Sequence, residues 1–287
     1  MPSCPACGRS VAVARAACLY CGTALAPDPG APSEPSRPTG AADEPSRLLL
    51  LLDLAATPLD VLAETLALSR YEAALHARRG GLHLVRAAGA GEAEAEAARL
   101  RSGGAAPFVV PEAEVRAAPV PCLAGERRGD VLVLRAGSAS LTFPGPDALI
   151  VVRGTIAREY QSRDATRRIA TARPAEGRRL HLHRRHDPHP LEIDALNFEV
   201  GFAASGSAQL EIDAWIEAVA GGVPRDDGFA HLPPALAPAL PEPGGALAAF
   251  GSLAAARGEA EGRLVLDNLA QFRFYSGCLA AVTRRRG

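Results

Sequence analysis

Four cysteines near the start of the chain have the spacing of a metal site. Cys4 and Cys7 form one Cys-x-x-Cys pair, Cys18 and Cys21 form a second, and a glycine follows each pair. Two such pairs offer four thiolates to one tetrahedral Zn²⁺ ion. A segment this short cannot bury enough apolar surface to fold alone, so a bound metal would hold it together. We therefore predict one structural Zn²⁺ with these four cysteines as its ligands.

Two other chemistries use paired cysteines, namely a disulfide and a thioredoxin-like redox motif. A redox pair opens a helix inside a β-α-β unit, and neither pair here has that context. Met1 to Ser3 lead into the first cysteine without an apolar segment, so we expect no signal peptide and a cytoplasmic location. That location favours metal over a disulfide. Because four sulfurs fill the coordination sphere, the ion would be structural and not catalytic.

The two cysteine knuckles resemble those of the short bacterial zinc-ribbon family. The matching runs are Cys4-Pro5-Ala6-Cys7-Gly8 and Cys18-Leu19-Tyr20-Cys21-Gly22. The resemblance covers residues 1–25 and implies a small zinc ribbon there. Residues 26–46 follow, rich in proline and acids, and a segment of that composition forms no packed core. We predict that it is a flexible tether.

Four histidines form a second cluster that could bind a metal: His181, His183, His186 and His189. The first two lie two positions apart on a predicted strand and so share a face. No cysteine is near them, and Asp187 and Glu192 have the pattern of ordinary loop or strand-edge residues. We expect a solvent-facing strand edge followed by a turn. A second metal site here is the alternative.

The segment 153–185 is rich in arginine. From Arg153 to Asp187 ten arginines face four acids, a local charge of +6. Such a patch could contact nucleic acid, lipid phosphates or an acidic protein. Aromatic residues are not interleaved with the arginines, so base stacking on a single strand is poorly supported. A solvated arginine loop is the simpler interpretation.

Composition limits the classes of function. The chain has 287 residues, a formal net charge of -1, 48% hydrophobic residues and only 5% aromatic residues. The length suits two modest domains in addition to the ribbon. The charge gives no global field that would attract nucleic acid or anionic lipid. We find no P-loop, no G-x-S-x-G elbow, no H-E-x-x-H helix and no cysteine with a plausible histidine partner, and predict no enzymatic activity.

Residues 47–120 alternate between strand and helix patterns. Strands are predicted at 48–54, 82–87 and 106–110, and a helix at 92–101. Two helices precede the second strand, one capped by Thr57 and one started by a capping box of Ser69 and Glu72. This β-α-β-α-β order predicts a small α/β sandwich. Gly89-Ala90-Gly91 is not a dinucleotide fingerprint, because its third glycine is missing and Glu92 follows directly.

Residues 121–222 change to an antiparallel pattern of short strands. These are predicted at Val131–Leu134, Ser140–Phe143, Leu149–Arg153, Thr155–Gln161, Arg179–His183 and Leu191–Gly201. A helix then ends at Ala220 and has Ile212, Trp215, Ile216 and Val219 on one face.

Part of this stretch, from about residue 130 to 222, resembles the pleckstrin-homology-like fold. Phe198-Glu199-Val200 and Trp215-Ile216-Glu217-Ala218-Val219 match that fold's last strand and closing helix. The resemblance implies a rolled sheet closed by the helix. Lipid ligands of that family cluster at the first hairpin, which here carries only Arg135, so lipid binding is not expected.

The remaining chain divides into a Pro-rich connector (223–244) and a helical segment (245–287). Helices are predicted at Ala246–Ala256 and Asn268–Arg284. Leu269, Phe272, Tyr275 and Leu279 form a stripe on the second helix, which we expect to dock on the core. Cys122 and Cys278, far from the knuckles, are expected to be buried small apolar residues.

The sequence therefore predicts a multidomain α+β protein. Its segments are a zinc ribbon (1–25), a linker (26–46), an α/β domain (47–120), a pleckstrin-like β module (121–222), a connector (223–244) and C-terminal helices (245–287). The predicted function is a non-enzymatic zinc-ribbon adaptor that binds other proteins. The alternative is a nucleic-acid-associated regulator that uses the ribbon and the arginine-rich segment 153–185. A hydrolase with an unrecognised site is a more distant third.

Overall fold

The computed structural model describes most of the chain from residue 47 onward. The described residues are 47–156, 158–163, 169–172, 177–195, 197–200, 208–229, 236, 259–260 and 263–286. They form a mixed α+β structure with four sheets and six α-helices within the described part. The predicted ribbon and linker lie outside these residues, as does the helix predicted at Ala246–Ala256.

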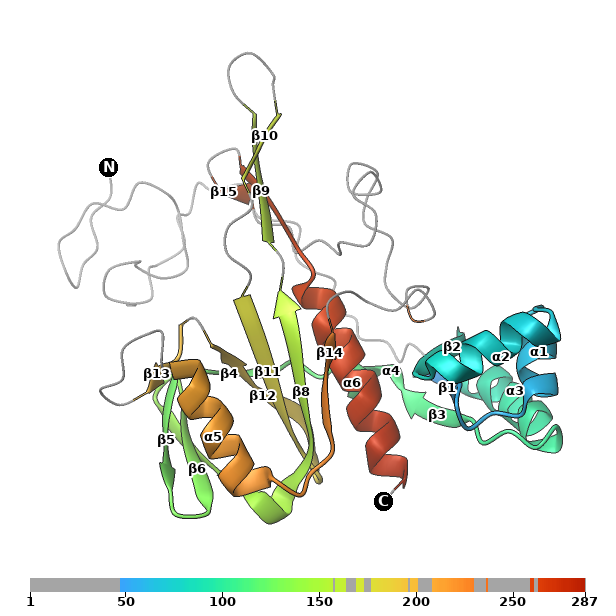
Figure 1. Cartoon of the computed structure of the whole chain (residues 1–287), viewed down its shortest axis with the longest axis horizontal. Coiled ribbons are helices and arrows are strands. Elements are labelled where there is room, and N and C mark those ends of the chain that lie inside the picture. Colours follow the sequence, from blue (N-terminus) through green and yellow to red (C-terminus); the bar gives the residue numbers. More distant parts are fainter. Residues whose placement is uncertain are drawn as a thin grey trace, which may run out of the picture. The chain divides into compact units, whose positions relative to one another are not determined.

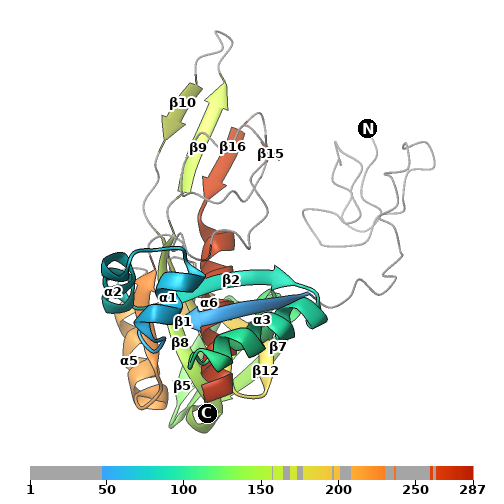
Figure 2. The same ribbon diagram turned by 90° about the vertical axis from the view of Figure 1, so that its right-hand side faces the viewer.

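A three-stranded antiparallel sheet with the order β2-β1-β3 comes first. Its strands are β1 (Leu48–Asp53), β2 (Leu82–Ala88) and β3 (Phe108–Pro111). Successive side chains of a strand point to opposite faces, so the leucine run of β1 is buried on both. Leu50 and Leu52 pack against helix α3 (Ala90–Ser102), which lies across the sheet in Figure 2. Leu49 and Leu51 belong to a core on the other face. The predicted buried strand is confirmed.

Three short helices complete this region: α1 (Leu59–Thr65), α2 (Arg70–Arg79) and α4 (Glu112–Val115). The capping box at α2 is confirmed, because the Ser69 hydroxyl accepts from Glu72 N–H and the Glu72 carboxylate accepts from Ser69 N–H. The cap predicted for α1 is wrong. Pro58 occupies the N-cap position, and the Thr57 hydroxyl instead donates to the Asp53 carbonyl, 2.7 Å away, within the turn after β1.

Two larger sheets follow, one with the order β13-β5-β6-β7 and one with the order β14-β8-β11-β12-β4. The first contains β5 (Ala124–Arg128), β6 (Val131–Ala136), β7 (Ala139–Pro144) and β13 (Glu199–Val200). The second contains β4 (Val120–Cys122), β8 (Ala148–Ile156), β11 (Gly177–Arg184), β12 (Asp187–Asp194) and β14 (Arg225–Phe229). The predicted antiparallel pairing holds for the hairpins, whereas β4, β13 and β14 pair in parallel with their neighbours.

Helix α5 (Ala208–Ala220) covers the core that these two sheets share. Ile212 and Ile216 are buried there together with Leu134 and Leu182, and Trp215 is partly buried against the same core. The predicted apolar face of the helix is therefore confirmed. Figure 1 shows α5 lying in front of β5 and β6.

Helix α6 (Leu269–Arg286) confirms the predicted C-terminal helix and docks as expected. Phe272 is fully buried, and Leu269, Tyr275 and Leu279 pack against the same core. That core also contains residues of β1, β2, β3, α4, β8 and β14. In Figure 1 α6 runs between β8 and β14 on one side and α4 on the other. The last helix of the chain is thus shared by the first sheet and the five-stranded sheet.

Two predictions for the C-terminal third are wrong. The connector 223–244 contains β14, and the segment 245–287 is not helical throughout, since β15 (Glu259–Ala260) and β16 (Arg263–Asp267) are strands. β16 joins a four-stranded sheet, β10-β9-β16-β15, with β9 (Arg158–Arg163) and β10 (Ile169–Ala172). Both β14 and β16 pair with strands far away in sequence, β8 and β9, and local pattern does not reveal such pairing.

Candidate functional site

The two first histidines of the predicted cluster lie in the interior. His181 and His183 each have only 1% of their surface exposed, so the expected solvent-facing strand edge is wrong at these positions. The reason is that β11 is the middle strand of its sheet and its histidine face packs against α6. His186 and His189, in the β11–β12 turn and at the start of β12, are exposed as expected.

Both buried imidazoles bind one hydroxyl on α6. Ser276 Oγ lies 2.9 Å from His181 Nδ1 and 2.7 Å from His183 Nε2. On its other side His181 Nε2 lies 3.0 Å from a carboxylate oxygen of Glu192, the residue opposite it on β12. Arg273 donates two hydrogen bonds of 2.8 Å to the same carboxylate. We call these five residues the histidine network.

The partners fix the direction of each hydrogen bond. An ionised Glu192 only accepts, so His181 carries its proton on Nε2 and a neutral ring then accepts at Nδ1. The single hydroxyl proton of Ser276 must point to that nitrogen, and Ser276 Oγ accepts from His183 Nε2–H. His183 Nδ1 is left as a bare acceptor, which agrees with its being buried without a hydrogen-bond partner. The protons of both imidazoles and of the Ser276 hydroxyl are therefore all used in hydrogen bonds.

Burial and neighbouring charges shift the pKa values in this network. Burial lowers the pKa of His181, although the hydrogen bond to Glu192 opposes the shift. Burial lowers the pKa of His183 further, and the nearby His181 and Arg284 act in the same direction. Burial alone would raise the pKa of Glu192, but hydrogen bonds from Arg273 and His181 hold it well below its usual range. Two neutral imidazoles beside an ionised carboxylate follow.

The order serine, histidine, carboxylate is also that of a nucleophile, its base and an orienting acid. Here Ser276 has no exposed surface, and two imidazoles occupy its hydroxyl. A substrate carbonyl has no approach to that oxygen in this arrangement. The network therefore connects α6 to β11 and β12, and it does not present a nucleophile.

Sequence reasoning missed three members of the network. Glu192 was expected to be an ordinary strand-edge residue, and Ser276 and Arg273 were not singled out. Two signals were present in the sequence: Glu192 follows the turn at a position that can face His181, and Arg273 and Ser276 are three apart on one helix face.

Among the described residues, no group of three or more His, Cys, Asp or Glu side chains could hold a metal ion. Cys4, Cys7, Cys18 and Cys21 lie outside that part of the chain, so the zinc site stays a prediction. Cys122 and Cys278 are free and buried, as expected. Burial raises the pKa of the Cys122 thiol to about 11.

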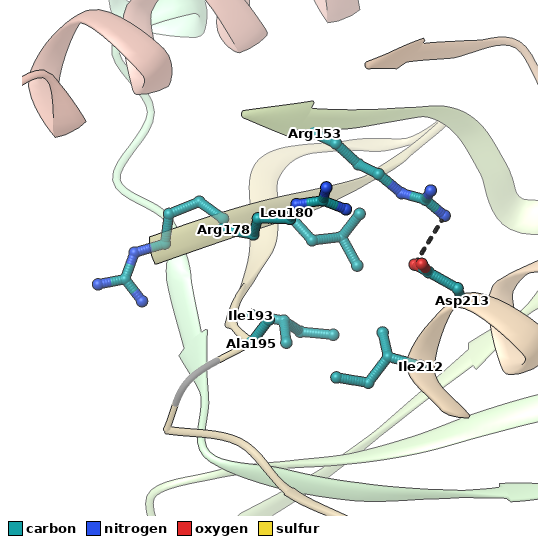
Figure 3. A pocket seen from close by; sticks show the side chains of 8 residues that line it. Arg153, Arg178, Leu180, Ile193, Ala195, Ile212 and Asp213 are labelled. Carbon is teal, nitrogen blue, oxygen red and sulfur yellow. Dashed lines mark ion pairs between the residues drawn. The ribbon is translucent and has the colours of Figure 1, made fainter. Parts of the chain in front are cut away.

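A small pocket opens elsewhere, between α5 and the ends of β8, β11 and β12. It has an empty volume of about 290 Å³, including its open mouth, and is lined by Arg153, Arg178, Arg179, Leu180, Ile193, Ala195, Ile212 and Asp213. The buried side chains of Leu180, Ile193 and Ile212 make its floor. Figure 3 shows Arg153 and Asp213 on one side of these apolar residues and Arg178 on the opposite side.

The three arginines of the pocket differ in their charge pairing. Arg153 lies 3.1 Å from Asp213 and 3.5 Å from Asp227, with 19% of its side chain exposed. Arg179 forms an ion pair with Asp194 and is 11% exposed. Arg178 is exposed and forms no ion pair within the described part of the chain. The pocket thus combines an apolar floor with two neutralised arginines, and at its edge Arg178 directs an unpaired guanidinium away from that floor in Figure 3.

The wider arginine-rich segment is less solvated than expected where its side chains are described. Arg153, Arg179 and Arg184 all form ion pairs with acids of this chain, the last with Asp187. Arg185 donates to the Pro146 carbonyl, 3.2 Å away. The acids near these arginines reduce the positive field that the sequence suggests.

Comparison with known proteins gives no relative. No family model matches the chain, and neither the curated proteins nor the solved structures contain a match. Among the described helices, none is long and apolar enough to cross a membrane. The likenesses to a zinc ribbon and to a pleckstrin-like fold therefore stay predictions from residues alone.

Proposed function

We propose that this protein is a non-enzymatic adaptor that binds an acidic side chain of a partner protein in the pocket beneath α5. The observation that carries the proposal is the open guanidinium of Arg178 beside a buried apolar floor.

We further propose that Cys4, Cys7, Cys18 and Cys21 hold one structural Zn²⁺ in a ribbon that provides a second contact surface. The cytoplasm, where thiolates stay reduced, is the compartment that suits such a site.

The pocket selects a carboxylate on an apolar stem. Leu180, Ile193 and Ile212 offer the stem a surface from which water is displaced. The guanidinium of Arg178 points away from these residues in Figure 3, and after a rotation of its side chain toward the pocket it can bind the carboxylate through two parallel hydrogen bonds. A glutamate side chain or the terminal carboxylate of a peptide meets both requirements.

The same geometry argues against the nucleic-acid alternative. Affinity for a phosphate backbone needs several unpaired cations, because each neutralised phosphate contributes separately. Arg153 and Arg179 already pair with aspartates, which leaves Asp213, Asp227 and Asp194 near any ligand. A polyanion would meet these carboxylates, whereas one carboxylate reaching Arg178 need not.

We also propose that residues 121–222 form a pleckstrin-homology-like module. Two sheets share one core and a single helix covers it, which supports the likeness. Its ligand pocket would differ from that family's lipid site, since it lies between α5 and the five-stranded sheet.

The test is a peptide array of apolar decamers that differ only by Glu or Gln at one position, followed by calorimetric titration of the best binder. Full-length protein should prefer the Glu peptides, and Arg178→Glu should weaken their binding by roughly tenfold or more. Arg127→Glu is the matched control, because Arg127 is also exposed and lies on β5, and among the described residues it makes only a hydrogen bond to the Gly129 carbonyl.

Equal binding of Glu and Gln peptides, or equal affinity in Arg178→Glu and wild type, would contradict the proposal. A salt-sensitive gel shift with oligonucleotides that Arg178→Glu abolishes would support the nucleic-acid alternative instead.

A further inference from the structure

We propose that the histidine network is a pH-dependent attachment of α6, which holds the helix on the five-stranded sheet only while both imidazoles are neutral. The inference is independent of the pocket beneath α5. It rests on the matched hydrogen-bond directions of His183, Ser276, His181, Glu192 and Arg273.

An additional proton on either imidazole finds no hydrogen-bond acceptor within the histidine network. A proton added at His181 Nδ1 would make that nitrogen a donor and turn the Ser276 hydroxyl toward His183 Nε2. His183 would then carry its own proton on Nδ1, for which the described residues provide no acceptor. A proton added directly at His183 Nδ1 meets the same lack of an acceptor. In both cases a buried donor loses its hydrogen bond, which is costly.

The charged groups around the two rings also disfavour a positive imidazole. His181 faces Glu192 on β12, Arg273, Ser276 and the ring of Phe272 on α6, and Arg179 on its own strand. His183 faces His181, Ser276 and Arg284. Glu192 is the one acid in this set, and Arg273 already binds both of its oxygens. A positive imidazole would therefore join a site in which the available negative charge is already paired.

The attachment of α6 should weaken as the pH falls, because the attached and detached states bind protons with different affinity. An unfolded histidine titrates near pH 6.5. The folded-state pKa of both buried histidines lies lower, because burial disfavours the charged rings. Acidification below about pH 6.5 therefore adds protons to the detached state first and shifts the equilibrium toward it. The attachment is complete above that pH and weakens progressively below it.

Detachment would have a large structural effect because α6 is central. Phe272, Phe274, Ala281 and Val282 of this helix are all buried in the core that joins the first sheet to β8 and β14. Loss of the network would expose this face of α6, whereas β6, whose Leu132 and Leu134 belong to a separate core, would keep its packing.

The experiment is hydrogen exchange of the full-length protein at about pH 7.5 and about pH 5.5, corrected for the intrinsic exchange rate. We expect α6 amides to lose roughly tenfold or more of their protection at the lower pH, while β6 amides keep theirs. His183→Gln should reduce this pH dependence, because its amide still donates to Ser276 but does not titrate. His186→Gln is the control, since it removes an exposed histidine from the same hairpin and should behave as wild type.

A measurement on the wild type alone covers the case in which a variant does not fold. Nitrogen chemical shifts at about pH 7.5 should show His181 and His183 as neutral rings protonated at Nε2. Another tautomer for either ring would overturn the inference. So would equal α6 protection at the two pH values, or a His183→Gln variant with the full wild-type pH dependence.

Discussion

Ser276 on α6 hydrogen-bonds both buried histidines of β11, and through His181 it is connected to Glu192 on β12. Among the described residues, its hydroxyl is the one group to which both buried imidazoles hydrogen-bond, and it has no exposed surface. Polar groups in an interior of low polarity stabilise a fold only when every partner is present. The one hydroxyl therefore determines whether the buried His183 Nε2–H has an acceptor or is left as an unpaired donor.

The first prediction concerns Ser276→Ala. The variant keeps the volume of the side chain nearly unchanged but leaves the His183 Nε2–H and the His181 Nδ1 lone pair without a partner. We expect a loss of about 1–3 kcal/mol in the free energy of unfolding, measured by urea denaturation at neutral pH. Ser102→Ala is the control, because that hydroxyl is exposed and bonds only the Arg99 carbonyl within its own helix. An unchanged urea midpoint for Ser276→Ala would show that the network adds no net stability.

At the scale of single elements, local signals in the sequence are sufficient wherever the cause is local. The Ser69 capping box, the unbroken leucine run of β1 and the apolar face of α5 all follow from patterns over a few residues. The elements that local reasoning misses depend on distant partners. β14 has the composition of a loop and is a strand because it pairs with β8, in which Val151, the partner of Arg225, lies more than 70 residues earlier in the chain.

The close approach of α6 to α4 gives the second prediction. A Cβ atom built on Gly277 would lie 2.1 Å from the carbonyl oxygen of Val115, so no larger residue fits without moving one of the helices. We expect Gly277→Ala to lower the free energy of unfolding by about 1–3 kcal/mol, measured by urea or thermal denaturation. The matched control is Gly91→Ala on α3, where a Cβ meets nothing within 4 Å. That change should stabilise the protein by up to about 1 kcal/mol, through higher helix propensity. Equal effects of the two substitutions would mean that α6 does not approach α4 so closely.

At the scale of the whole molecule, the order of segments along the chain does not show which ones share a core. The sequence separates residues 47–120, 121–222 and 245–287 by composition and periodicity. Contacts group residues 45–287 into a single unit, with α6 packed against β3, α4 and β8. The local sequence does not encode which face of a sheet a distant helix covers. For this reason the strand pattern of His181 and His183 predicts exposure, although α6 buries them.

The third prediction concerns the proposed zinc ribbon of residues 1–25, which lie outside the described part of the chain. Elemental analysis of purified protein should find about one zinc per chain, and Cys7→Ser should remove it, because a tetrahedral site that loses one of four thiolates binds its metal far more weakly. The thermal unfolding of the unit 45–287 should not change in that variant. Cys122→Ser is the control for zinc content, since Cys122 is a free cysteine buried in the core that α5 covers and is not one of the four proposed ligands. Native protein without zinc, prepared without chelator, would refute the site.

The last prediction tests whether α6 is an integral part of the fold or an appended helix. A chain that ends before Leu269 would lose Phe272, Phe274, Cys278, Ala281 and Val282 from the core, and with them the Ser276 and Arg273 contacts to β11 and β12. It would also lose the ion pairs of Arg284 and Arg285 with Glu114, which join the end of α6 to α4. The free energy of unfolding that these buried side chains contribute exceeds the total stability of an ordinary domain, which is about 5–15 kcal/mol. The core that contains α6 should therefore not stay packed without them. We therefore expect the truncated protein to bind a hydrophobic dye and to lose the wild-type thermal transition, while the separate core around Leu132 and Leu134 stays packed. Deletion of residues 2–44 is the matched control and should leave the transition in place, because residues 45–287 form one unit by themselves. A truncated protein that still unfolds cooperatively near the wild-type temperature would show that the two sheets form stable cores without α6, and the central role of that helix would have to be abandoned.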